Sequence, residues 1–187
     1  MADPLKAWQF VLSNEDTVPP SGKVVDEPNG GKARLGINSI AHPEALARGF
    51  FSMPLAQALD FAEDIFKYDY WSRILGYNIH PCLQIVASKW ADLVFNAGIH
   101  EGTIIVQRAL NSLRGPNQKI KEDGICGPST IAALNTLLDE PDVERIYQAI
   151  IAAGTAFYAE LRTAFPEKYS EALEREWIGR LDRRPPV

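Results

Sequence analysis

The sequence predicts a mainly α-helical protein, two helical lobes beside a cleft, with one small β-hairpin near the N-terminus. Apolar residues recur at intervals of three and four along most of the 187 residues, the spacing of the buried face of a helix. Proline or a capping residue precedes several of these runs, and glycine or proline follows them. Strand-like segments are confined to residues 23–37.

Composition excludes two kinds of partner. The formal net charge is −5, and lysine and arginine cluster only at residues 180–184, whereas nucleic-acid binding needs a dense basic face. No apolar run approaches membrane-spanning length, and the N-terminus has no signal-peptide pattern, so we expect a chain that is cytoplasmic as synthesised. Cys82 and Cys126 are expected to be two buried, unpaired thiols. No His lies in metal-ligand spacing with them, so no metal or other cofactor is expected.

The first helix is expected to begin at Asp3-Pro4, a capping residue followed by proline at the first helical position. Glu15 follows Val11 by four residues, so it lies at the C-terminal end of the helix on the apolar side. Nearby apolar rings and the negative end of the helix dipole should raise the pKa of this carboxyl, as a general acid requires. A solvated last-turn glutamate is the alternative interpretation.

A break at residues 19–22 separates this helix from two short strands, predicted at residues 23–25 and 33–37. The turn between the strands would carry Asp26 and Glu27 at the tip of the hairpin, opposite the end of the first helix. Both are also ordinary turn residues.

The rest of the chain is predicted to be helical, and each helix has turn residues at its ends. Asp139 should cap the longest helix, and residues 182–187 should form a disordered tail. The expected helices span roughly residues 52–71, 81–98, 104–115, 128–138 and 139–165, with a final short helix leading to residues 177–180.

Several separated motifs fit one pattern when they are taken in order. They are Glu15, Glu27-Pro28-Asn29-Gly30-Gly31, Gly36-Ile37, Tyr70-Trp71, Asp92 with Asn96-Ala97-Gly98, Gln107-Arg108-Ala109-Leu110, Asp123-Gly124-Ile125-Cys126-Gly127-Pro128-Ser129-Thr130, and Trp177 with Arg180. This series resembles glycoside hydrolase family 108, the N-acetylmuramidases of phage endolysins and secretion systems, joined to a peptidoglycan-binding-like C-terminal region.

The resemblance implies a lysozyme-like fold and hydrolysis of the β-1,4 bond between N-acetylmuramic acid and N-acetylglucosamine. Glu15 would be the general acid, and Glu27, or Asp26 if the turn slides, would hold the attacking water or stabilise the oxocarbenium-like state. The catalytic region would span residues 1–88, and the peptidoglycan-binding-like region residues 89–181.

Four further residues are predicted to contact the glycan strand, with structural roles as the alternative. Tyr70 and Trp71 would stack on sugars or pack between the lobes. Asn96, one helical turn from Asp92, would hydrogen-bond near the acid, and Gln107 would face the cleft. The implied partners are peptidoglycan glycan strands and a holin or secretion machinery that gives access to the wall, so that the protein acts in the periplasm after release.

The sequence also departs from the family pattern. The family has Gly-Gly-Tyr after the acid, where this chain has residues 16–18 as Asp-Thr-Val, and a threonine where this chain has Ala33. A methyl group cannot orient a water molecule. Retention, a lytic transglycosylase with one essential glutamate, a wall-binding or assembly protein without turnover, and a helical adaptor unrelated to sugars therefore remain alternatives.

Overall fold

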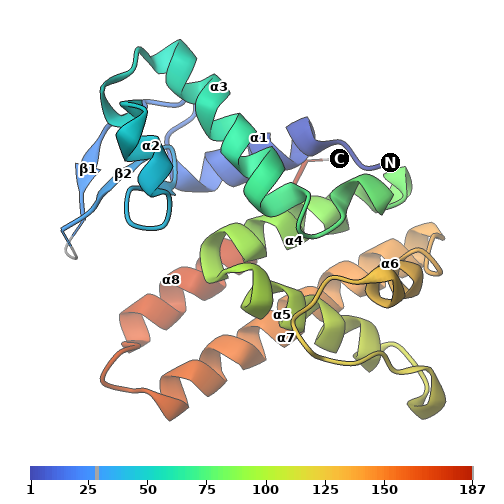
Figure 1. Cartoon of the computed structure of the whole chain (residues 1–187). Helices are drawn as coiled ribbons and strands as arrows, with labels where there is room; N and C mark the ends of the chain where they lie inside the picture. The colour runs from blue at the N-terminus through green and yellow to red at the C-terminus, as the bar shows by residue number, and fades with distance from the viewer. Residues whose placement is uncertain (28–29, 187) are drawn as a thin grey trace.

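The structure, a computed structural model, describes residues 1–27 and 30–186 and is mainly helical, as predicted (Figure 1). Within these residues, eight α-helices follow one another, and a small antiparallel sheet lies near the N-terminus. The helices are α1 (Pro4–Glu15), α2 (Pro43–Ala47), α3 (Leu55–Ile65), α4 (Gln84–Ala97), α5 (Ile99–Ser112), α6 (Pro128–Leu134), α7 (Glu140–Ala164) and α8 (Glu171–Leu181).

Helix α4 is the centre of the protein. Its ten consecutive residues from Ile85 to Val94 are all buried, as expected of a helix that is covered on every side. Helices α1, α5 and α7 all pack against it (Figure 1). The predicted boundary between residues 88 and 89 therefore lies inside a helix that belongs to the packing of both halves, and the division into two functional regions stays a prediction.

Helix α1 forms as its sequence predicts. The Asp3 side chain accepts a hydrogen bond from the backbone N–H of Leu5 at 2.8 Å, and Pro4 is the first helical residue. Trp8 and Val11 are buried against the core. The helix ends at Glu15, so the turn that carries this carboxylate is anchored by the apolar residues before it.

The sheet has three strands instead of the predicted hairpin. Its order is β1 (Val25–Asp26), β2 (Lys32–Arg34) and β3 (Ile37–Asn38), all antiparallel. The predicted second strand is interrupted because Leu35 and Gly36 have positive φ angles of 52° and 77°, which turn the chain back on itself. The predicted turn residues Pro28 and Asn29 lie outside the described residues.

The segment after the last helix differs from the prediction, whereas the helix predicted to end at residue 71 does end there. The chain after α8 packs on the protein: the Tyr147 hydroxyl donates to the carbonyl of Arg183 at 3.2 Å, and Arg184 pairs with Glu144 at 2.6 Å. The prediction of disorder is therefore wrong for residues 182–186. Further upstream, helix α3 continues directly into a π-helical turn at Phe66–Trp71.

The two cysteines are free thiols, as expected. Cys126 is partly buried, but Cys82 is exposed because it lies in the surface 3-10 turn Pro81–Leu83, so the prediction of burial is wrong for this residue. No helix among the described residues is long and apolar enough to cross a membrane.

Candidate active site

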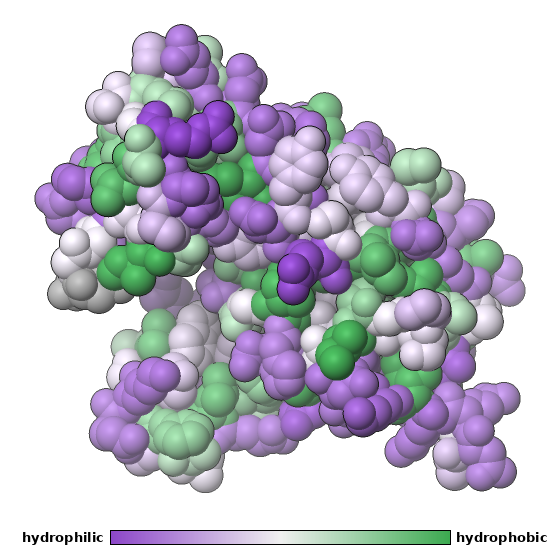
Figure 2. Space-filling view, viewed as in Figure 1, coloured by the Kyte–Doolittle hydropathy of each residue, from purple (hydrophilic) through white to green (hydrophobic). Residues whose placement is uncertain are grey.

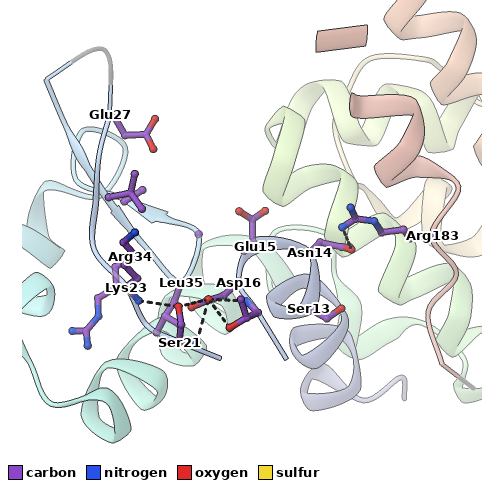
Figure 3. A pocket seen from close by; sticks show the side chains of 14 residues that line it. Ser13, Asn14, Glu15, Asp16, Ser21, Lys23, Glu27, Arg34, Leu35 and Arg183 are labelled. Atoms are coloured by element: carbon purple, nitrogen blue, oxygen red, sulfur yellow. Dashed lines mark hydrogen bonds between the residues drawn. The ribbon is translucent and has the colours of Figure 1, made fainter. Parts of the chain in front are cut away.

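A pocket of about 700 Å³ lies between the end of α1 and the sheet. Its volume falls within the ~300–1,000 Å³ that is typical of ligand sites. Figure 2 shows the surface hollowed on the side where the sheet and α8 face each other. Glu15 and Glu27 both line the pocket, and in the close-up they stand on opposite sides of it (Figure 3).

Glu15 is a largely buried carboxylate that forms an ion pair. Its side chain is 19% exposed, and its Oε1 lies 2.5 Å from Nη1 of Arg180 in α8. Burial raises the pKa of Glu15 above its ordinary value, although the positive charge of Arg180 acts in the opposite direction and the Asp92 carboxylate adds to the rise. The raised pKa expected from the sequence is confirmed, with burial as its main cause.

Arg180 connects Glu15 to a buried ionic cluster on α4. Its Nε and Nη2 donate to Oδ1 of Asp92 at 3.1 and 2.7 Å, and its Nη1 lies 3.4 Å from Oδ1 of Asn96. Lys89, which is fully buried, lies 3.9 Å from the other oxygen of Asp92 and donates to the carbonyl of Arg180 at 3.3 Å. When Glu15 is ionised, two carboxylates and two cations balance in this cluster.

Sequence reasoning placed Asp92 and Asn96 near the acid but missed the contact of Arg180 with Glu15. The available signal was a lysine and an aspartate three residues apart in a helix that is otherwise almost wholly apolar. Such a pair, Lys89 and Asp92, requires further polar partners when it is buried. Burial lowers the pKa of Lys89 to about 8, although the Asp92 carboxylate counteracts this change.

Gly36 lets the sheet approach the acid closely. With φ at +77°, a side chain here would be strained, and a Cβ atom would lie 2.7 Å from Cγ of Glu15 and 2.7 Å from Cε1 of Phe95. Only glycine fits between the two. The turn between β2 and β3 thus packs directly on the glutamate side chain and limits the positions it can adopt.

Asp16 follows the acid and organises the wall of the pocket. Its carboxylate accepts hydrogen bonds from the backbone N–H groups of Thr17 and Gly22 at 2.7 Å each, and from the hydroxyl of Ser21 at 2.6 Å (Figure 3). Burial alone would raise the pKa of Asp16, but these hydrogen bonds outweigh it and lower the pKa. The carboxylate therefore holds the loop 16–22 in place.

The two predicted partners of Glu15 occupy different places. The described lining of the pocket includes Glu27 but not Asp26. The Asp26 side chain is 86% exposed and pairs with Lys32 at 3.1 Å, its neighbour in the sheet register. The geometry therefore favours Glu27 as the second carboxylate, and its catalytic role stays a prediction.

Two of the predicted sugar contacts are wrong. Trp71 is fully buried and packs 6.2 Å from Phe66, ring centre to ring centre, so it has no exposed face for a sugar. Gln107 is 1% exposed: its amide nitrogen donates to Asp123 at 3.1 Å, and its oxygen accepts from the N–H of Gly124 at 2.9 Å. Gln107 supports the turn at Asp123, which is the structural alternative considered for it.

Tyr70 and Asn96 are partly exposed, and their sugar contacts stay predictions. The Tyr70 hydroxyl lies 2.8 Å from Nε2 of His42, and burial, with smaller contributions from nearby carboxylates, raises its pKa to about 12. Asn96 lines a second pocket of about 330 Å³ together with Trp177 and Tyr158, on the α7–α8 side of the molecule.

One group of side chains has the composition of a metal site. Ligand atoms of His42, Glu44 and Asp69 lie within 4.8 Å of one another. Both ring nitrogens of His42 already have partners, however, since Nδ1 lies 3.0 Å from Glu44 and Nε2 lies 2.8 Å from the Tyr70 hydroxyl. The imidazole is therefore satisfied by protein groups alone, which is typical of a structural histidine.

Comparisons with known proteins agree with this architecture. Residues 101–181 match the sequence family described as "Predicted Peptidoglycan domain", which relates this part of the chain to peptidoglycan. The solved structure of Brucella abortus SagA is similar, with a TM-score of 0.57 and 20% sequence identity, over 95% of this chain and 93% of that chain. At that identity the likeness concerns the fold. No curated protein shows a significant sequence match.

Proposed function

We propose that the protein is a peptidoglycan hydrolase of the N-acetylmuramidase type, with Glu15 as its general acid. The observation that carries the proposal is a largely buried carboxyl with a raised pKa, placed in a pocket that a second carboxylate lines from the other side. Glycosidases use this pairing of one protonated and one ionised carboxyl group. The peptidoglycan relationship of residues 101–181 supports the choice of substrate.

In the proposed reaction Glu15 donates its proton to the oxygen of the β-1,4 bond as that bond breaks. Positive charge develops on the departing sugar ring, and the Glu27 carboxylate stabilises it or activates the water that attacks it. Ala33 lies on the central strand and also lines the pocket, where its methyl group offers no hydrogen bond to a water molecule. Glu27 would therefore carry the water-directing role without help from this position.

The substrate would be the glycan strand of the bacterial wall, and the protein would act in the periplasm. A holin or a secretion machinery would give it access, either during phage lysis or when a local gap in the wall is opened.

Glu15→Gln tests the enzyme function. The amide keeps the shape of the side chain but has no acidic proton, so clearing of outer-membrane-permeabilised cells should disappear while the far-UV circular dichroism is unchanged. Asp26→Asn is the matched control, because it removes a carboxylate that is exposed on the same side of the protein. Equal clearing by wild type and by Glu15→Gln would reject the proposal.

A wall-binding protein without turnover is the second candidate, favoured by Ala33 in the pocket and by the match of the C-terminal part alone to a peptidoglycan family. Sedimentation with purified peptidoglycan, followed by mass spectrometry of the supernatant, separates the candidates. Binding without soluble muropeptides selects this second function. Released fragments with reducing ends indicate hydrolysis, whereas anhydro ends indicate a lytic transglycosylase.

A further inference from the structure

We propose that Arg180 is a positioning residue for proton transfer by Glu15, so that the C-terminal region is part of the catalytic unit as well as a contact to the wall. This inference rests on the proposed function of Glu15. It starts from the ion pair between Arg180 in the last helix and Glu15 in the first, two residues that are far apart in the sequence.

Hydrogen bonds fix the orientation of the Arg180 guanidinium, so that it can orient the Glu15 carboxylate. Two of its nitrogens donate to one oxygen of Asp92, and the third, Nη1, lies 2.5 Å from Glu15 and 3.4 Å from the Asn96 side-chain oxygen. A planar group that is fixed along one edge presents its remaining N–H groups in a defined direction. Because the Arg180 side chain is only 14% exposed, little solvent competes for these contacts.

The helix that carries Arg180 is itself firmly docked. Trp177, one turn earlier, packs with its ring centre 4.9 Å from that of Tyr158 in α7. Just beyond α8, Arg183 donates to the Asn14 side chain at 3.0 Å, and Asn14 in turn donates to Asp92 at 2.9 Å. The end of α1 is therefore fastened to α4 and to the C-terminal segment at the residue directly before the acid.

The charge of Arg180 acts on both states of the acid. In the resting protein it opposes the effect of burial and prevents the Glu15 carboxyl from becoming too weak an acid. After the proton has moved to the glycosidic oxygen, Glu15 is an anion next to a guanidinium that is already in place, and no solvent needs to rearrange. Without Arg180, Glu15 and Asp92 would lose the cation that lies between them. The charged or titratable groups around this contact are Arg180 from α8, Asp92 and Lys89 from α4, Tyr70 from the π-helical turn and Tyr158 from α7.

Arg180→Met, compared with Arg175→Met, tests the inference. Arg175 lies on the same helix, is 71% exposed and pairs with Glu171 within it, so this control removes one positive charge away from Glu15. Turnover of soluble glycan strands is measured across pH for both variants. For Arg180→Met we expect the high-pH limb of kcat to move to higher pH, and the maximal kcat to fall on the order of tenfold to a hundredfold with little change in KM. The control should behave as wild type does.

Arg180→Lys adds a variant that keeps the charge but cannot hold both carboxylates. In Arg180→Lys the high-pH limb should lie close to its wild-type pH, whereas the maximal kcat should stay well below the wild-type value. Arg180→Lys is also the deciding variant if Arg180→Met does not fold. An NMR titration of the Glu15 carboxyl carbon in the folded Arg180 variant gives a readout that needs no activity, with a higher midpoint expected in Arg180→Met.

An unchanged Glu15 midpoint together with an unchanged pH profile would overturn the inference. Full activity in Glu15→Gln would instead overturn the proposed function, and the NMR titration would still report whether Arg180 controls the carboxyl. The two failures are therefore distinguishable.

Discussion

The two walls of the pocket are built in different ways. Glu15 stands at the end of a twelve-residue helix, and its carboxylate is held by Arg180 from the other end of the chain. Glu27 stands beside strands of two and three residues, and the hydrogen bonds from its N–H to Gly31 and from Gly30 to its carbonyl are local to the turn. The Glu15 carboxylate is thus held by a contact between distant segments, whereas the backbone of Glu27 is held by its neighbours in sequence.

This difference fits the two chemical roles that we propose for Glu15 and Glu27. A general acid must be in place with its proton before the substrate arrives, and burial within a packed interior provides both conditions. A carboxylate that stabilises charge or directs water has to meet a sugar ring of variable position. The edge strand beside Glu27 is two residues long and exposed, so fewer packing contacts hold that side. Substitutions on the α1 wall should therefore affect stability and catalysis together, and substitutions on the sheet wall mainly catalysis.

The largest effect is expected for Asp92→Ala, in the ionic cluster on α4 that supports the α1 wall through Arg180 and Asn14. Removing this carboxylate leaves Lys89 and Arg180 buried with too little negative charge, which typically costs about 3–5 kcal/mol. Urea denaturation should show this loss in the free energy of unfolding. Asp26→Ala, which removes an exposed ion pair on the sheet, should change it by less than ~1 kcal/mol. Similar values for the two variants would refute the contrast between the walls.

Glu27→Gln should come next, and its effect should be catalytic. Loss of the second carboxylate should lower kcat on the order of a hundredfold, about 2.7 kcal/mol in activation free energy, while the urea midpoint stays the same. Steady-state kinetics on glycan strands and a denaturation curve on the same preparation measure both quantities. If Glu27→Gln retains wild-type kcat, the second carboxylate is elsewhere, or the reaction uses one glutamate only.

Comparing Gly36→Ala with Gly30→Ala isolates the effect of the close contact between the β2–β3 turn and the Glu15 side chain. Both glycines have positive φ, so both variants carry backbone strain of about 1 kcal/mol. A Cβ at Gly36 also meets Glu15, whereas a Cβ at Gly30 meets nothing within 4 Å. We expect kcat to fall about tenfold in Gly36→Ala only. Equal activities would mean that the sheet does not position the acid.

A last effect, on the pH dependence of stability alone, is expected from the titration of Lys89. Its pKa is about 8 in the folded protein and near the ordinary 10.5 when unfolded, so between these values the unfolded chain binds more protons. Stability should therefore rise with pH above 8, by at most about 1.4 kcal/mol per pH unit. Denaturation between pH 7.5 and 9.5 measures this slope. Tyr70 and Tyr147, with pKa values of about 12, act in the opposite direction above this range, whereas the Cys126 thiol, whose pKa burial raises from 9.0 to about 12, already opposes the rise near its upper end.

Lys89→Met is the control for this titration. The variant lacks the titrating amine, so the difference in slope between wild type and variant isolates its contribution from those of other groups. A wild-type slope that persists in the variant would assign the pH dependence to another residue.

Most helices were readable from the sequence because they depend on contacts within a few residues, although α2 was not predicted, α5 begins at Ile99 instead of 104, and α6 ends at Leu134 instead of 138. The cap at Asp3, the proline that begins α6 and the placement of Glu15 at the end of α1 all follow from local hydrogen bonding and apolar spacing. The strand predicted at residues 33–37 was wrong because the turn at Leu35 and Gly36 depends on packing against the acid, which no local pattern reports.

By itself, the sequence determined that the protein is mainly helical, that a glutamate ends its first helix, and that two carboxylates follow before the central strand of a small sheet. Only the tertiary structure decided which of those two lines the pocket and that Arg180 reaches Glu15. It also decided that Trp71 and Gln107 are buried away from any sugar. The physical reason is the distance along the sequence between the residues that interact. Helix formation is governed by neighbours three or four residues away, whereas burial and charge pairing depend on segments that meet only after the whole chain has folded.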